Sequence, residues 1–211
     1  MEPNQAAEHL QAIRTLMEHS AVYRRALAPV MTFCGAVGIA GGILGDDLPL
    51  HTAHGFVLFW AVVAVVVLCG SFLMVRRQAL KDAEPFWSPP TRRVTRAFLP
   101  GLVAGAGAGA LLMYQNPYWG ACAFIVPVWC ILFGLALHSA GFFMPRGLKL
   151  FGWIFMAAGG LLLVLLGGHL LNPNLVALIF QPHWLMGLTF GGLPLTYGIY
   201  LYFTEKRRPT S

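Results

Sequence analysis

The chain has 211 residues, of which 57% are hydrophobic and only 10% are charged, and its formal net charge is +6. A typical soluble domain is roughly 45–50% apolar and about 25% charged, so this composition excludes soluble globular domains and disordered chains. The 4 cysteines are too few for a disulfide scaffold, and we interpret them as small apolar packing residues. The sequence therefore predicts an integral membrane protein.

The N-terminal segment, residues 1–26, precedes the first apolar stretch and has helical periodicity. Ala6, Leu10, Ile13 and Met17 fall on one face, whereas the charged side chains lie off it. We predict a cytoplasmic amphipathic helix that lies in the headgroup region, packs under its own bundle or docks on a partner. Because the start is polar and acidic, unlike a signal peptide, we expect no cleavage, and we expect the first apolar stretch to direct insertion.

Six apolar segments follow, each long enough to cross a hydrocarbon core about 30 Å thick, which needs roughly 20 residues per helix. They are 27–44, 55–75, 97–114, 118–143, 148–171 and 184–203. Polar, proline-containing breaks after Tyr114 and after Leu171 divide the two longest charge-free stretches. We therefore predict an all-α integral membrane fold with six transmembrane helices in three helical hairpins. The amphipathic helix precedes the bundle at 27–203, and a basic cytoplasmic tail at 204–211 follows it.

The basic residues indicate the orientation of these helices. If both termini are cytoplasmic, all 14 Lys and Arg residues lie on the inner side, and the outer loops carry no charged residues except Asp46 and Asp47. A positive-inside partition this complete supports the number of spans. We expect a multi-pass protein of the bacterial inner membrane, and its basic charge requires no nucleic-acid partner.

The odd-numbered predicted helices are rich in glycine. The spacings Gly38-x-x-x-Gly42 and Gly101-x-x-x-Gly105 are typical of places where small residues let two helix backbones approach closely. They predict close helix packing, either within the chain or between copies of it in an oligomer. The similarity between the three hairpins is compatible with a threefold duplication or with shared membrane composition.

The loop predicted at 76–96 combines basic residues with two central aromatic residues. Aromatic residues flanked by basic clusters are typical of contact with anionic lipid headgroups. The residues predicted to bind lipid or a partner are Arg76, Arg77, Lys81, Phe86, Trp87, Arg92, Arg93 and Arg96. We expect anionic headgroups of the inner face, and a cytoplasmic or membrane protein, as the partners of this loop.

Two short motifs carry a resemblance to a known group of proteins. The first is IRTLMEHSAVY, from Ile13 to Tyr23, and the second comprises MPRGL from Met144 and FGW from Phe151. Together they resemble a group of bacterial six-helix membrane proteins without an assigned function. The resemblance implies pairing with a winged-helix transcriptional regulator, and hence a membrane partner in a regulatory couple.

Ionisable side chains within spans are costly and therefore point to function. His138, beside Ser139 in the cytoplasmic third of the fourth predicted helix, is either a hydrogen-bonded helix contact or part of a proton relay or gate. No carboxylate falls in the core of a predicted span. This argues against an ion-coupled transporter and leaves a passive channel open.

Histidines and carboxylates gather at the predicted outer face. The candidate metal ligands are Asp46, Asp47, His51, His54, His169 and His183. Imidazole and carboxylate groups bind zinc, copper or iron, and two histidines on facing helices can hold a haem. The alternative is that they are ordinary interfacial loop residues, so the sequence predicts no cofactor outright.

The chain has none of the G-x-S-x-G, H-E-x-x-H or Walker motifs that mark common enzyme classes. We therefore favour a non-enzymatic inner-membrane protein, a sensor or a regulatory or accessory subunit that acts through its cytoplasmic helix and basic loop. The alternatives are an outer-face metal- or haem-binding membrane protein and a small-solute channel or permease.

Overall fold

The computed structural model describes residues 27–48, 52–81, 89–115, 119–144, 146–167 and 181–206. Within these ranges every regular element is a helix. The predicted amphipathic helix at 1–26 and most of the predicted basic tail lie outside them.

Six helical segments follow one another along the described residues, and each overlaps one predicted apolar segment. They are the first helix (Leu27–Asp47), α2 (Ala53–Lys81), α3 (Pro89–Gln115), α4 (Trp119–Ala140), α5 (Arg146–Gly167) and a sixth segment made of α7 (Pro182–Met186), the π-helix η1 (Gly187–Gly192) and α8 (Leu193–Lys206). Among the described residues, 5 helices are long and apolar enough to cross a membrane by length and composition. The predicted all-α class is thus confirmed.

The predicted basic loop at 76–96 is shorter in the structure. Helix α2 continues to Lys81 and α3 begins at Pro89, so the prediction was wrong at both ends of the loop. An apolar pattern marks only the apolar part of a helix, whereas arginine, lysine and glutamine are also good helix formers and extend the helix beyond that part. Proline is favoured in the first turn of a helix, which fits the start of α3.

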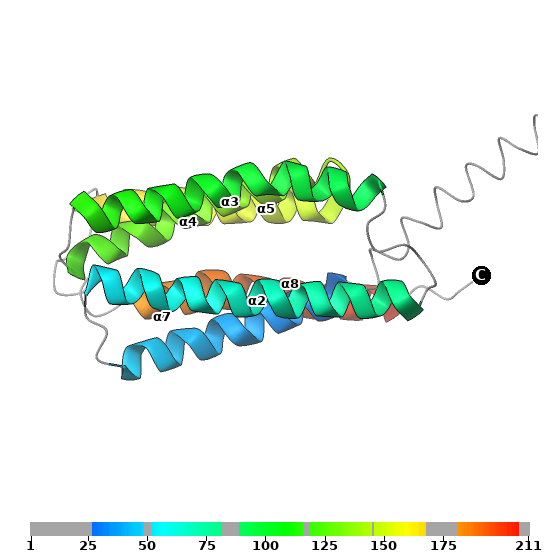
Figure 1. Ribbon diagram of the computed structural model, residues 1–211, viewed down its shortest axis with the longest axis horizontal. Coiled ribbons are helices and arrows are strands. Elements are labelled where there is room, and N and C mark those ends of the chain that lie inside the picture. The colour runs from blue at the N-terminus through cyan, green and yellow to red at the C-terminus, as the bar shows by residue number, and fades with distance from the viewer. Residues whose placement is uncertain are drawn as a thin grey trace, which may run out of the picture.

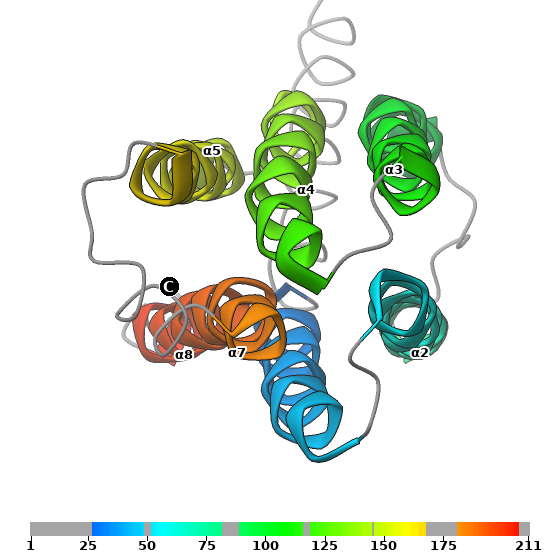
Figure 2. The ribbon, with the colours of Figure 1, turned by 90° about the vertical axis from the view of Figure 1, so that its left-hand side faces the viewer.

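The six segments form two layers of three helices. Figure 2 shows α3, α4 and α5 in one layer, and α2, the first helix and the segment α7–α8 in the other. At one edge of the layers α2 faces α3, and at the other edge α5 faces the segment α7–α8. Helices that are consecutive in sequence are therefore neighbours around the bundle (Figures 1 and 2).

Within the second of these layers, the first helix lies directly against the sixth segment; we call this contact the first seam. A Cβ built on Gly38 would lie 2.7 Å from the Cα of Gly191, and one built on Gly42 would lie 2.9 Å from the Cα of Gly187. Only glycine allows backbones to approach so closely. The close packing predicted from Gly38-x-x-x-Gly42 is confirmed, and its partner is the matching motif Gly187-x-x-x-Gly191.

In the other layer, α4 lies against α5 in a second close contact, the second seam. A Cβ built on Gly134 would lie 2.7 Å from the carbonyl oxygen of Gly152, and one built on Gly159 would lie 2.7 Å from the carbonyl oxygen of Pro127. Both seams join helices that belong to different predicted hairpins. Close packing also occurs within one predicted hairpin, because a Cβ built on Gly101 of α3 would lie 2.6 Å from the Cβ of Ala136 on α4.

The sixth segment changes from an α-helix to a π-helix at Gly187–Gly192. This stretch ends in two adjacent glycines, and Pro194 follows in the first turn of α8. Glycine weakens an α-helical turn and proline has no N–H to donate to the turn before it, so a wider π-helical turn is accommodated here. The segment is helical throughout, but none of its three parts has the length of a membrane span.

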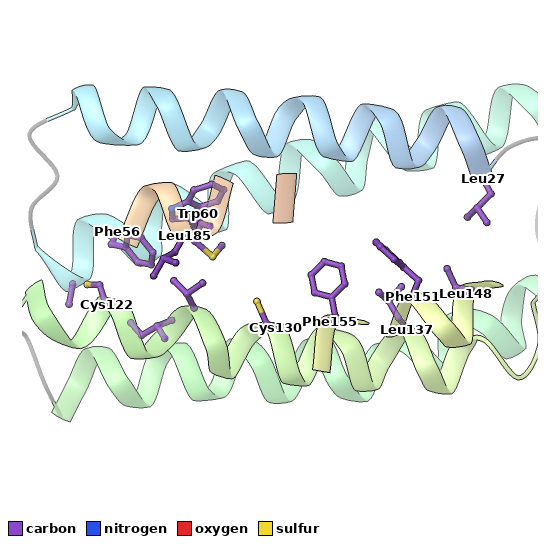
Figure 3. Packing of buried hydrophobic residues seen from close by; sticks show 14 residues of the cluster. Leu27, Phe56, Trp60, Cys122, Cys130, Leu137, Leu148, Phe151, Phe155 and Leu185 are labelled. Atoms are coloured by element: carbon purple, nitrogen blue, oxygen red, sulfur yellow. The ribbon is translucent and has the colours of Figure 1, made fainter. Parts of the chain in front are cut away.

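Large side chains fill the space between the two layers. The ring of Phe190, from η1, lies 5.4 Å from that of Phe133 on α4 and 5.5 Å from that of Phe155 on α5, measured between centroids. Nearer the start of α5, Phe151 stacks on Tyr197 at 4.4 Å. Figure 3 shows the buried side chains, among them Phe151 and Phe155, between the layers. These aromatic contacts stabilise the packing of the two layers against each other.

Candidate functional site

A buried histidine lies at one end of the first seam. His183, in α7, is only 1% exposed, and its Nδ1 accepts a hydrogen bond of 3.2 Å from Nε1 of Trp60 on α2. The rings of Phe56 and Phe59 lie 4.9 Å and 5.6 Å from the imidazole ring. We call these four residues the His183 cluster.

The local sequence explains how the cluster forms. Phe56, Phe59 and Trp60 are three and four residues apart, which places them on one face of α2. On the opposite side, a Cβ built on Gly45 would overlap the ring of His183. The imidazole therefore occupies a space that the missing side chain of Gly45 leaves open at the end of the first helix.

The hydrogen bond decides the tautomer of His183. An indole N–H can only donate, so Nδ1 is the acceptor, and the neutral ring carries its hydrogen on Nε2. Because His183 is helical and buried, its interpretation as an interfacial loop residue was wrong. A metal ion would need an unprotonated ring nitrogen, and here Nδ1 already accepts from Trp60.

Of the remaining candidate metal ligands, the structure describes only Asp46, Asp47 and His54. His51 and His169 lie outside the described residues, while His54 and Asp47 are exposed. Asp46 accepts a hydrogen bond of 3.0 Å from Nε1 of Trp184, which ties the end of the first helix to α7. The described part of the chain contains no group of three histidine, cysteine or carboxylate side chains able to hold a metal ion. A metal or haem site therefore stays a prediction that depends on His51 and His169.

The other candidate histidine, His138, lies near the end of α4, at the opposite end of the bundle. Its ring contacts those of Phe142 and Trp153 edge-on, with centroids 5.4 Å and 5.6 Å away. Its Nδ1 is buried and, in the part of the chain that the structure describes, has no hydrogen-bond partner. The backbone carbonyl of the neighbouring Ser139 accepts from the N–H of Phe142 at 3.4 Å, where α4 gives way to a turn. These contacts include no side-chain hydrogen-bond partner for His138. They therefore support neither proposed role, a hydrogen-bonded helix contact or a proton relay or gate.

The predicted lipid- and partner-binding residues gather at this same end of the bundle. The exposed members are Arg76, Arg77 and Lys81 in the last turns of α2 and Arg92, Arg93 and Arg96 in the first turns of α3. Figure 1 shows these two helix ends together at the right, whereas the first helix ends at the left. Phe86 and Trp87 lie outside the described residues. We call the six cations the basic end.

No known protein family, no curated protein and no solved structure matches the chain significantly. The resemblance to the bacterial six-helix group therefore stays a prediction that rests on the two sequence motifs.

The sequence analysis missed the aromatic residues around His183 and a polar contact in the core. Thr189, in η1, is buried; its hydroxyl donates to the carbonyl oxygen of Leu185 at 2.7 Å and also contacts the thiol of Cys130. The helical spacing of Phe56 and Trp60 was a visible signal for a shared face, but nothing in it indicated that His183 would be the partner.

Proposed function

We propose that the chain is a six-span protein of the bacterial inner membrane, with both termini in the cytoplasm, and that it acts as a non-enzymatic accessory or regulatory subunit through its basic end. Large apolar side chains that point away from the bundle support membrane insertion. Leu58 and Val62 on α2 are each 63% exposed, and Leu161 on α5 is 59% exposed. In water such surfaces are unfavourable, whereas lipid chains cover them.

The observation that carries the orientation is the separation of charge along the bundle. The exposed cations of the basic end lie at one end, and Asp46 and Asp47 lie at the other. This arrangement supports placing the basic end in the cytoplasm, because basic residues flanking membrane helices are retained on that side.

The shape of the basic end supports a binding role. Because α2 and α3 continue as helices beyond their apolar parts, they present arginine and lysine side chains on ordered helical turns rather than on a loop. Clustered cations of this kind attract anionic headgroups or an acidic segment of a partner protein.

Cysteine labelling tests the orientation. The native cysteines, Cys34, Cys69, Cys122 and Cys130, all lie within the apolar helices. In intact spheroplasts, a membrane-impermeant maleimide is expected to label Asp47→Cys at once and Arg77→Cys only after permeabilisation. Val66→Cys, in the middle of α2, is the matched control and is expected to stay unlabelled in both conditions. The opposite order of labelling would reverse the proposed orientation.

Co-purification tests the accessory role. We expect a protein partner to co-purify from native membranes and to be lost from the combined variant Arg76→Gln, Arg77→Gln and Lys81→Gln. The control, Asp47→Asn, changes charge at the other end and is expected to retain the partner. A partner set unaffected by the combined variant would contradict the proposed role of the basic end.

A further inference from the structure

We propose that an anionic phospholipid binds where α4 turns into α5, with its phosphate at Lys149 and its acyl chains along Leu150 and Trp153. This inference rests on the membrane insertion proposed above. It concerns a single cation outside the basic end, and it assigns a specific lipid site where the sequence indicated only a general attraction to the inner leaflet.

The position of Lys149 is set by its neighbours. Its Nζ lies 3.6 Å from the centroid of the Phe142 ring, in a cation–π contact. Its side-chain stem crosses the end of α4 at Gly141, where a built Cβ would lie 2.6 Å from Cγ of Lys149. A larger residue at 141 would displace the stem, so glycine at the turn lets the ammonium group reach Phe142.

The Phe142 ring holds the ammonium group of Lys149 in position. In the part of the chain that the structure describes, no carboxylate side chain near it neutralises its charge. The carboxylates whose side chains are described there, Asp46 and Asp47, lie at the far end of the bundle. A ring face attracts the cation and leaves ammonium N–H donors for an anion. Lys149 also lies in the first turn of the long helix α5, whose N-terminal partial positive charge favours an anionic group.

The surface beside Lys149 is apolar and faces outwards. Leu150 is 65% exposed, Phe142 64% and Trp153 58%. The ring of His138 contacts both Phe142 and Trp153, which makes the three rings one continuous cluster. Tryptophan next to a lysine at a helix end is typical of the membrane interface, where the ring lies among headgroups and upper acyl chains.

Together these features favour a phospholipid over a soluble anion. Free phosphate would use the charge of Lys149 but would leave Leu150 and Trp153 without a partner, whereas an anionic phospholipid uses both.

Native mass spectrometry of the purified full-length chain tests the site. In micelles containing equal phosphatidylglycerol and phosphatidylcholine, we expect the wild type to retain phosphatidylglycerol preferentially. Lys149→Gln is expected to lower this preference about fivefold, the effect of one basic residue at an anionic surface, while Lys149→Arg retains it. Asp47→Asn changes one charge at the other end of the bundle, beyond a Debye length from Lys149, and is expected to change the preference less than about twofold. A preference as high in Lys149→Gln as in the wild type would overturn the specific site.

Quenching of Trp153 by lipids brominated on their acyl chains separates this inference from the proposed membrane insertion. The emission of Trp153 is obtained as the difference between the wild type and Trp153→Phe. We expect stronger quenching by brominated phosphatidylglycerol than by brominated phosphatidylcholine. Equal quenching by both would leave insertion standing and overturn the phospholipid site. No quenching by either would place Trp153 outside the lipid and contradict insertion itself.

Discussion

The two seams bring helix backbones together with glycine in two different ways. In the first seam, glycines recur at every turn of the first helix, at Gly35, Gly38, Gly42 and Gly45, and each lies against the sixth segment. In the second seam, the glycines are seven residues apart, at Gly134 on α4 and Gly141 in the turn that follows α4, and at Gly152 and Gly159 on α5.

The two seams also differ in what surrounds particular glycines. Around Gly38 and Gly191 in the first seam, the nearest atoms are mainly backbone atoms, which cannot move without moving a helix. In the second seam, the three atoms nearest to a Cβ built on Gly152 are likewise backbone atoms, whereas a side-chain atom of Ile131, which can change rotamer, is among those nearest to Gly159. We therefore expect Gly191 to tolerate an added methyl group less well than Gly159.

Gly191→Ala is expected to have the largest effect. A Cβ at this position would lie 2.5 Å from the backbone nitrogen of Ile39 and 2.8 Å from the carbonyl carbon of Gly38. We expect the free energy of unfolding to fall by about 3 kcal/mol, the upper end of the range for overpacking. Unfolding in mixed micelles titrated with SDS measures this change.

The adjacent Gly192 provides the matched control, because a Cβ there has no neighbour within 4 Å. Gly192→Ala is expected to change stability by no more than about 0.5 kcal/mol. If both variants lost the same stability, the effect would come from the π-helical backbone and not from the seam.

Gly159→Ala makes the corresponding change in the second seam. Its Cβ would lie 2.7 Å from the carbonyl oxygen of Pro127, but also 2.8 Å from Cγ1 of Ile131, a side-chain atom that can move. We expect a loss of about 1–2 kcal/mol by the same measurement, smaller than for Gly191→Ala. The control Gly160→Ala has open space and is expected to be neutral or to stabilise by about 0.5–1 kcal/mol, since alanine favours the helix. A larger loss at 159 than at 191 would reverse the comparison.

Much of the first seam could be predicted from the sequence, because spacing is a local property. Gly38-x-x-x-Gly42 indicated a close approach, and Gly187-x-x-x-Gly191 has the same spacing and could have been matched to it. The glycines of the second seam are seven residues apart and do not form that motif. Which helices become neighbours depends on the whole bundle, so no local pattern indicated the pairing of α4 with α5.

The candidate sites could likewise be predicted only where they depend on local sequence. The clustering of Arg76 and Arg92 at one end follows from their positions near the end of α2 and the start of α3, and these two helix ends lie at the same end of the bundle. The burial of His183 could not be inferred in this way, because it depends on the absence of a side chain at Gly45 and on a donor, Trp60, from a third helix. A polar residue at the start of a predicted span was therefore interpreted as a loop residue.

Trp60→Phe tests whether the end of the first seam depends on the His183 cluster as well as on glycine. The substitution keeps an aromatic ring but removes the hydrogen bond to Nδ1 of His183, which is then buried without that donor. We expect a loss of about 1–2 kcal/mol in the same unfolding assay. Nitrogen-15 NMR of histidine side chains provides a second measurement, in which the Nδ1 signal of His183 is expected to shift in this variant.

Trp184→Phe is the comparison for that variant and has the smallest expected effect. Nε1 of Trp184 donates to Asp46 at 3.0 Å across the same end of the seam, but Trp184 is 43% exposed. Water can replace the lost donor at this partly exposed carboxylate, so we expect a loss of about 0.5 kcal/mol or less and no shift of the His183 Nδ1 signal. A loss as large as that of Trp60→Phe would mean that the link between the first helix and α7, and not the buried imidazole, stabilises this end of the seam.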